Sequence, residues 1–145
     1  MVNAYPDTSF LFNLYAPQAH SARATAHFAA MTEPLHLTSL NRFELVNAIQ
    51  LSFFRGTMPR NTGLLALEKL DANIAIGALV VVSCDWPAVH GRALQISMQH
   101  TGKGGHRGFD ILHVATALEL GAKELLTFDA QQSALAKAVG LKVKP

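Results

Sequence analysis

The stretch Gly108-Phe-Asp-Ile-Leu-His-Val-Ala-Thr-Ala-Leu-Glu-Leu-Gly121 decides how the rest of the chain is arranged. Its apolar residues fall on nearly every helical face from Phe109 to Leu120, which predicts a helix buried in the middle of a domain. Asp110 therefore enters a core, where an unpaired carboxylate stays ionised only at a cost of several kcal/mol. We expect Asp110 to have a partner, a cation or a place at the rim of the first helical turn.

Two further aspartates stand where a short strand gives way to a helix. Gly121 ends the central helix, the next residues form a short buried strand, and Asp129 precedes a helix over 130–139. Asp7 likewise follows a strand over 2–5 and precedes an apolar turn over 10–15. Ligands of open parallel sheets bind beyond the carboxyl ends of the strands, so this pattern predicts a site that includes both aspartates.

The composition predicts one domain over residues 1–145, since 145 residues with 50% apolar content fit a single core. We expect a cytoplasmic protein with no membrane association, because no apolar run reaches ~18 residues and no signal peptide is indicated. The net charge of +2 permits nucleic-acid binding without requiring it. The single cysteine, Cys84, excludes an internal disulfide and is interpreted as structural filler in a buried strand.

The rest of the chain alternates between strand and helix patterns. Asp85 is interpreted as the N-cap of a helix that runs to about residue 100. No repeat or linker divides the chain, so an α/β fold with a central, mostly parallel sheet flanked by helices is predicted. The other expected segments are helices over 19–31, 40–54 and 59–76, strands over 35–38, 79–83 and 141–144, and a flexible basic loop over 101–108.

A fourth acid, Glu44, lies in the helix over 40–54 among apolar neighbours and has no Lys or Arg four residues later to form a surface pair. If Asp7, Glu44, Asp110 and Asp129 converge, each pair at ~4 Å repels by about 4 kcal/mol at an effective dielectric of about 20. Such a cluster needs shared protons or bound cations. All-oxygen ligands favour Mg²⁺ or Mn²⁺, which implies phosphate chemistry; the alternative is two N-caps and two incidental core acids.

Four motifs in this order resemble the PIN-domain ribonucleases, especially the VapC-type toxins of bacterial toxin-antitoxin pairs. The motifs are Asp7-Thr-Ser after a strand, Phe43-Glu44-Leu-Val-Asn-Ala within a helix, Phe109-Asp110-Ile-Leu-His-Val-Ala-Thr-Ala opening another, and Leu126-Thr-Phe-Asp129 at a strand end. The resemblance spans the whole chain and implies a PIN-like three-layer fold. It also implies a Mg²⁺-dependent endoribonuclease, in which Mn²⁺ can substitute, usually a homodimer and neutralised by a small VapB-like antitoxin.

The resemblance assigns all four acids to catalysis. Asp7 and Asp110 map onto the principal metal ligands, Glu44 and Asp129 complete the quartet, and Asp129 is expected to be a further metal ligand. The implied reaction is phosphodiester hydrolysis, in which Mg²⁺ binds a phosphate oxygen and activates a water molecule for in-line attack.

Several polar residues are candidates for supporting roles. His113, one turn after Asp110, is interpreted as a core histidine that needs one hydrogen bond rather than as the catalytic base. The hydroxyl groups are expected either to orient ligands and water or to cap helices, and the basic groups either to contact the RNA backbone or to form a solvated face. The hydroxyl candidates are Thr8, Ser9 and Thr127, and the basic candidates are Lys103, His106, Arg107 and Arg42.

Two other classes of function remain open on the sequence. An aspartyl-nucleophile phosphatase would have a second Asp two residues after the first, and position 9 is Ser9. A catalytically silent RNA- or protein-binding module would not need the full set of acids.

Overall fold

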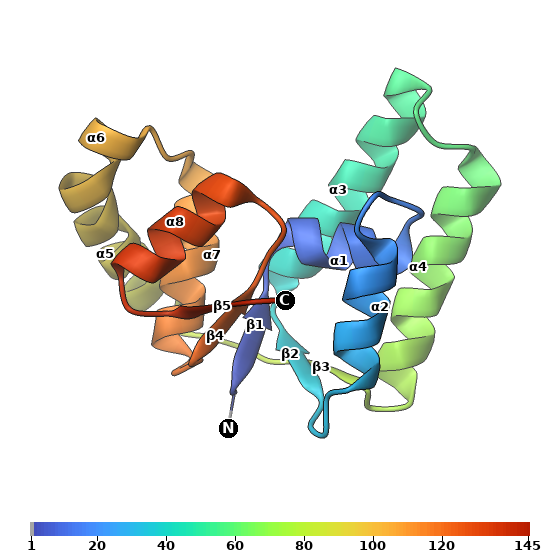
Figure 1. Ribbon diagram of the computed structural model, residues 1–145, viewed down its shortest axis with the longest axis horizontal. Helices are drawn as coiled ribbons and strands as arrows, with labels where there is room; N and C mark the ends of the chain where they lie inside the picture. Colours follow the sequence, from blue (N-terminus) through green and yellow to red (C-terminus); the bar gives the residue numbers. More distant parts are fainter. Residues whose placement is uncertain (1) are drawn as a thin grey trace. The chain divides into compact units, whose positions relative to one another are not determined.

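The computed structural model describes residues 2–145 (Figure 1). The chain divides into two compact units, a first unit of the residues up to Asp7 with Ser83–Pro145, and a second unit of Thr8–Val82. In chain order the elements are β1 (Ala4–Pro6), α1 (Thr8–Tyr15), α2 (Ser21–Ala29), β2 (Leu35–Leu37), α3 (Ser39–Arg55), α4 (Arg60–Ala75), β3 (Leu79–Val81), α5 (Trp86–Ile96), η1 (Ser97–Thr101), α6 (Gly102–Gly104), α7 (Gly108–Glu119), β4 (Glu124–Leu126), α8 (Ala130–Ala138) and β5 (Lys142–Lys144).

The first unit contains a three-stranded parallel sheet in the order β1-β4-β5. Pro6 pairs with Leu126, and Leu126 pairs with Lys144. The ladder extends one step further, because the amide of Asp7 donates a hydrogen bond to the carbonyl of Leu126 at 3.0 Å. The carboxyl ends of β1 and β4 therefore lie at the same edge of the sheet.

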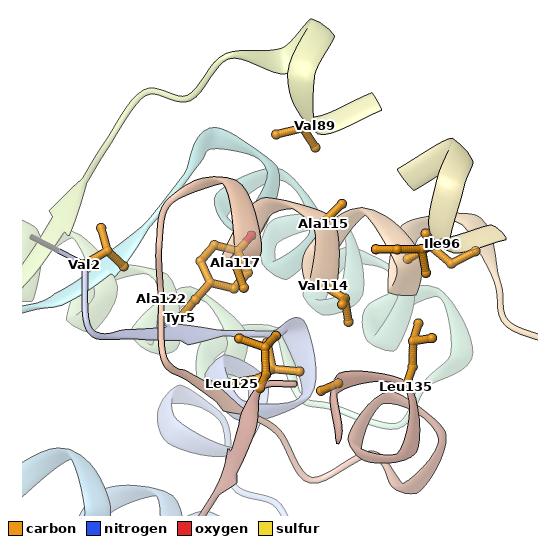
Figure 2. Packing of buried hydrophobic residues seen from close by; sticks show 13 residues of the cluster. Val2, Tyr5, Val89, Ile96, Val114, Ala115, Ala117, Ala122, Leu125 and Leu135 are labelled. Carbon is orange, nitrogen blue, oxygen red and sulfur yellow. The ribbon is translucent and has the colours of Figure 1, made fainter. Parts of the chain in front are cut away.

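The core of the first unit lies between this sheet and its helices. α7 and α8 pack against the sheet, and α5 packs against α7. Each fully buried leucine there contributes about 1.5 to 3 kcal/mol of hydrophobic stabilisation. Figure 2 shows side chains of β1, β4, α5, α7 and α8 meeting in one cluster, among them Tyr5, Leu125, Val89, Ile96, Val114 and Leu135.

The central helix α7 confirms the prediction of a buried helix. Its buried residues are Ile111 and the run from His113 to Ala117. Asp110 lies in the first turn, and the helix is followed by Gly121 at φ 74°, a left-handed conformation that glycine adopts without steric cost.

The second unit holds a two-stranded parallel sheet, in which β2 pairs with β3, together with helices α1 to α4. The helix that carries Glu44, α3, begins with a capping box between Thr38 and Asn41. It buries Leu45 and Ile49 and ends at Gly56, whose φ is 67°. These caps set where α3 begins and ends, and therefore where Glu44 lies within the helix.

The predicted α/β class, with parallel strands flanked by helices, is confirmed. Asp85 caps α5 as predicted, because its Oδ1 accepts a hydrogen bond from the amide of Ala88 at 3.1 Å. The assignment of Cys84 to a buried strand was wrong: β3 ends at Val81, and Cys84 is partly exposed. Pairing with β2 extends one residue beyond β3, where the amide of Val82 donates a hydrogen bond to the carbonyl of Leu37. Cys84 lies two residues after this last hydrogen bond.

The loop expected over 101–108 is shorter than predicted. The backbone continues from α5 through a π-helical turn, η1, and a short turn, α6, as far as Gly104. Gly105, at φ 68°, then ends the helical run while its amide bonds the carbonyl of Thr101 at 2.8 Å. The glycines thus end a helix instead of forming a long loop.

Within residues 2–145, every helix is too short or too polar to cross a lipid bilayer. The single domain over 1–145 stays a prediction.

Candidate functional site

Asp7 is placed by the end of β1. Its backbone continues the pairing with β4, and its side chain is 4% exposed. The hydroxyl of Thr127, the residue after β4, donates a hydrogen bond to Oδ2 of Asp7. A buried carboxylate that accepts a hydrogen bond from a hydroxyl in this way has a fixed orientation.

Asp129 is placed by the same side chain and by the start of α8. Its amide donates to Oγ1 of Thr127 at 3.0 Å, and its Oδ1 accepts from the amide of Gln132 at 2.9 Å. The second contact makes Asp129 the N-cap of α8, the kind of role considered above as the alternative to an acidic cluster. Capping uses Oδ1, and no described residue donates a hydrogen bond to Oδ2, which leaves that oxygen available to a cation.

Asp110 lies in the first turn of α7, where the helix dipole stabilises a negative charge. Its Oδ2 is 3.3 Å from Nε of Arg107, the residue at the N-cap position of α7. The Arg107 side chain is 80% exposed and that of Asp110 is 26% exposed, so the ion pair is open to solvent and weak. Asp110 was expected to have a partner, a cation or a place at the rim of the first turn, and the structure shows an ion-pair partner and a first-turn position.

Glu44 belongs to the second unit, on α3. Its Oε1 accepts a hydrogen bond from the hydroxyl of Thr8 at 2.8 Å, and its side chain is partly buried. Thr8 thus orients one of the predicted acids, while the backbone carbonyl of Ser9 accepts a hydrogen bond from Nδ2 of Asn13.

The predicted basic residues differ in their surroundings. Lys103, in α6, and Arg107 are exposed, whereas His106 is partly buried and its ring lies against Gly104. A Cβ at position 104 would come within 2.4 Å of Nε2 of His106, so the glycine is what permits this close approach. Arg42 forms an ion pair with Asp71 of α4 at 2.9 Å on the surface of the second unit.

The acids of the first unit suit a hard divalent cation by their chemistry. Asp7 and Asp129 both lie beyond the carboxyl ends of paired parallel strands, and all candidate donors are carboxylate oxygens, as Mg²⁺ and Mn²⁺ prefer. Among residues 2–145, however, no three or more His, Cys, Asp or Glu side chains stand in an arrangement that could hold a metal ion. The joint binding of one ion by Asp7, Asp110 and Asp129 stays a prediction.

One polar residue was missed by the sequence analysis. Tyr5, in β1, forms a buried hydrogen bond to Nδ1 of His113 at 3.1 Å. His113 is therefore a core histidine with a hydrogen-bond partner, as interpreted from the sequence. The only local signal for Tyr5 was its place two residues before Asp7, on the same face of the strand.

The fold and its acidic positions define an α/β protein with parallel sheets and carboxylates at strand ends. The PIN domain family matches residues 4–138, nearly the whole chain. The chain therefore belongs to the PIN domain family. No curated protein sequence matches it.

Solved structures share this fold. VapC20 of Mycobacterium tuberculosis, described as a Sarcin-Ricin loop cleaving toxin, is 19% identical with a TM-score of 0.71, over 99% of this chain and 100% of that chain. The DNA-bound VapBC of Salmonella typhimurium is 17% identical with a TM-score of 0.68, over 99% and 98% of the two chains. FitAcB of Neisseria gonorrhoeae is 18% identical with a TM-score of 0.66, over 98% and 96%. At identities this low, the similarity shows that these proteins share the fold of this chain.

Proposed function

We propose that residues 1–145 form a single PIN-like domain that hydrolyses RNA phosphodiester bonds as a Mg²⁺-dependent endoribonuclease, in which Mn²⁺ can substitute. We further propose that it acts as the toxin of a toxin-antitoxin pair. Membership of the PIN domain family supports the nuclease activity. The similar folds of VapC20 and of the VapBC and FitAB assemblies support the toxin role.

The observation that carries this proposal is the chain of contacts from Asp7 through Thr127 to Asp129. One hydroxyl donates to the first carboxylate and accepts from the backbone of the second acid. Such outer contacts are typical of residues that orient metal ligands. Two independent helix caps would not need these contacts. An N-cap does not need a hydroxyl that donates a hydrogen bond to a carboxylate at the end of another strand.

Asp7, Asp110 and Asp129 would hold Mg²⁺. We also propose a catalytic role for Glu44, which belongs to the second unit. When bound, Mg²⁺ would neutralise phosphate charge and lower the pKa of a water molecule. Thr127 keeps Asp7 oriented and Thr8 keeps Glu44 oriented.

The RNA backbone would be met by basic side chains. Lys103 and Arg107 are exposed and could therefore contact phosphate groups. His106 lies between them in the sequence, with its ring close to Gly104. Arg42 would have to leave its exposed pair with Asp71 to reach RNA, which costs little because exposed ion pairs contribute about 0 to 1 kcal/mol.

The proposed partners are a small VapB-like antitoxin and a second copy of the chain, and the proposed location is the cytoplasm. Solved VapBC and FitAB assemblies of similar fold support the antitoxin.

The deciding experiment incubates the purified chain with a mixture of end-labelled RNAs in Mg²⁺ and in EDTA. We expect cleavage in Mg²⁺, none in EDTA, and none by Asp110→Asn under either condition. Glu68→Gln is the matched control, since it also neutralises an acid but lies exposed on α4 of the second unit. Metal-independent cleavage, or RNA bound but left intact, contradicts the proposal.

The same preparation tests the phosphatase alternative. An aspartyl-nucleophile phosphatase would form a covalent phosphoenzyme at Asp7, visible as a mass increase after incubation with a phosphate monoester. We expect no such adduct.

A further inference from the structure

A buried polar contact inside the core of the first unit joins β1 to α7. Tyr5 is 0% exposed and His113 is 1% exposed, and the Tyr5 hydroxyl and Nδ1 of His113 lie 3.1 Å apart. The two rings also pack, with centroids 5.9 Å apart at an interplanar angle of 44°. Figure 2 shows Tyr5 reaching from its strand into the cluster of buried side chains.

Both partners lie a short, defined step from a predicted metal ligand. Tyr5 precedes Asp7 by two residues in extended backbone, and side chains two apart in a strand point to the same face. His113 follows Asp110 by three residues in α7, and side chains three apart lie on the same face of a helix. The hydrogen bond therefore connects the face of β1 that carries Asp7 with the face of α7 that carries Asp110.

The other buried residues of α7 cannot set this relationship as sharply. Ile111, Val114, Ala115 and Ala117 are apolar, and apolar contacts are non-directional. Thr116 is polar, but its hydroxyl donates to Leu112 within the same helix and so does not connect α7 to the sheet. A hydrogen bond restricts both distance and angle, and a buried one has no water to replace a lost partner.

We propose that the Tyr5–His113 hydrogen bond is a positioning contact that fixes the separation of Asp7 and Asp110 for binding a divalent cation. Tyr5 and His113 are positioning residues, and neither contacts the substrate. The inference rests on the proposed function, because it requires that both aspartates bind the metal.

The test measures Mn²⁺ affinity by electron paramagnetic resonance and, in parallel, thermal unfolding in EDTA. Tyr5→Phe removes the hydroxyl and keeps the ring. His113→Leu removes the partner of the Tyr5 hydroxyl, whereas His113→Asn keeps a polar atom close to the position of Nδ1. We expect about tenfold weaker Mn²⁺ binding for Tyr5→Phe and His113→Leu, the range typical of lost outer contacts to metal ligands, and affinity close to wild type for His113→Asn.

Thr116→Val is the matched control. Thr116 is also fully buried in α7, and its Oγ1 donates to the carbonyl of Leu112 at 2.6 Å, a contact that stays within the helix. The variant removes a buried hydroxyl from α7 without removing a contact to β1, so Mn²⁺ affinity should stay unchanged. The double variant Tyr5→Phe/His113→Leu should bind Mn²⁺ no more weakly than either single variant, because both remove the same contact.

The outcomes separate the two proposals. If wild type binds Mn²⁺ and Tyr5→Phe binds it as well as Thr116→Val does, the positioning role is overturned and the proposed function stands. If wild type binds no Mn²⁺ up to millimolar concentration, the proposed function fails and this inference fails with it.

Discussion

Thr127 donates the hydrogen of its hydroxyl to Oδ2 of Asp7, a residue 120 positions earlier in the sequence. The same hydroxyl oxygen accepts the amide hydrogen of Asp129 at 3.0 Å. One small side chain at the end of β4 therefore determines the orientation of one acid and the backbone position of another.

Replacing Thr127 by Val should destabilise the protein by about 1 to 3 kcal/mol at neutral pH, because the buried carboxylate of Asp7 loses its donor while the volume is conserved. Urea unfolding measures this change. Thr127→Ser keeps the hydroxyl and should lose much less. Equal losses in the two variants would show that the methyl group, rather than the hydrogen bond, is what matters.

Asp110→Asn should leave stability nearly unchanged and weaken Mg²⁺ binding at least tenfold. The variant loses an exposed ion pair with Arg107 and the interaction of a negative charge with the dipole of α7, each of which contributes about 0 to 1 kcal/mol, but it also removes one anionic ligand. Calorimetric titration with Mg²⁺ and urea unfolding in EDTA measure the two effects. Unchanged Mg²⁺ affinity would exclude Asp110 as a ligand.

Two substitutions of Asp129 separate its capping role from its charge. Asp129→Ala should lower stability by about 1 kcal/mol in EDTA, since the amide of Gln132 loses its acceptor. Asp129→Asn keeps a good cap and should match wild-type stability, yet both variants should bind Mg²⁺ more weakly. A large stability loss in Asp129→Asn would mean that the charge itself stabilises the start of α8.

Gln132→Met should raise stability by about 1 kcal/mol or more. Gln132 is 1% exposed, and neither the nitrogen nor the oxygen of its buried side-chain amide has a hydrogen-bond partner among the described residues. Methionine has nearly the same shape without the cost of desolvating a polar group. The backbone amide at this position still donates its hydrogen bond to Asp129. A drop in the urea midpoint would indicate that an ordered water satisfies the amide.

The stability of the protein should fall in alkaline solution because of Tyr15. Burial raises the pKa of Tyr15 to about 12, and the hydrogen bond from Nδ2 of Asn73 lowers it in part. The folded state keeps the phenol proton where the unfolded chain, with a pKa near its ordinary value of 10.0, loses it. The contribution is thus fully present below pH 10 and is lost as the pH rises toward about 12.

Urea unfolding at about pH 9 and about pH 11 measures this effect. Tyr15→Phe should show a smaller decline than wild type, because other groups titrate equally in both proteins. An equal decline would mean that the phenol titrates normally.

The sequence by itself determined the local features of this protein. The dense apolar pattern around Asp110 specified a buried helix, and Gly121 marked its end, because helix burial and C-caps depend on residues a few positions apart. The strand-to-helix junctions at Asp7 and Asp129 followed from the same short-range signals. The extent of the helical run after α5 was misjudged, since glycines both interrupt and end helices.

Only the tertiary structure decided which side chains meet. The order β1-β4-β5 brings Thr127 to Asp7, and the packing of α7 brings His113 to Tyr5, 108 residues away. Such contacts depend on strand order and on helix placement over the sheet, which no local pattern encodes. The sequence could place each acid at the end of an element, whereas the hydrogen bonds that orient Asp7 exist only once distant strands pair.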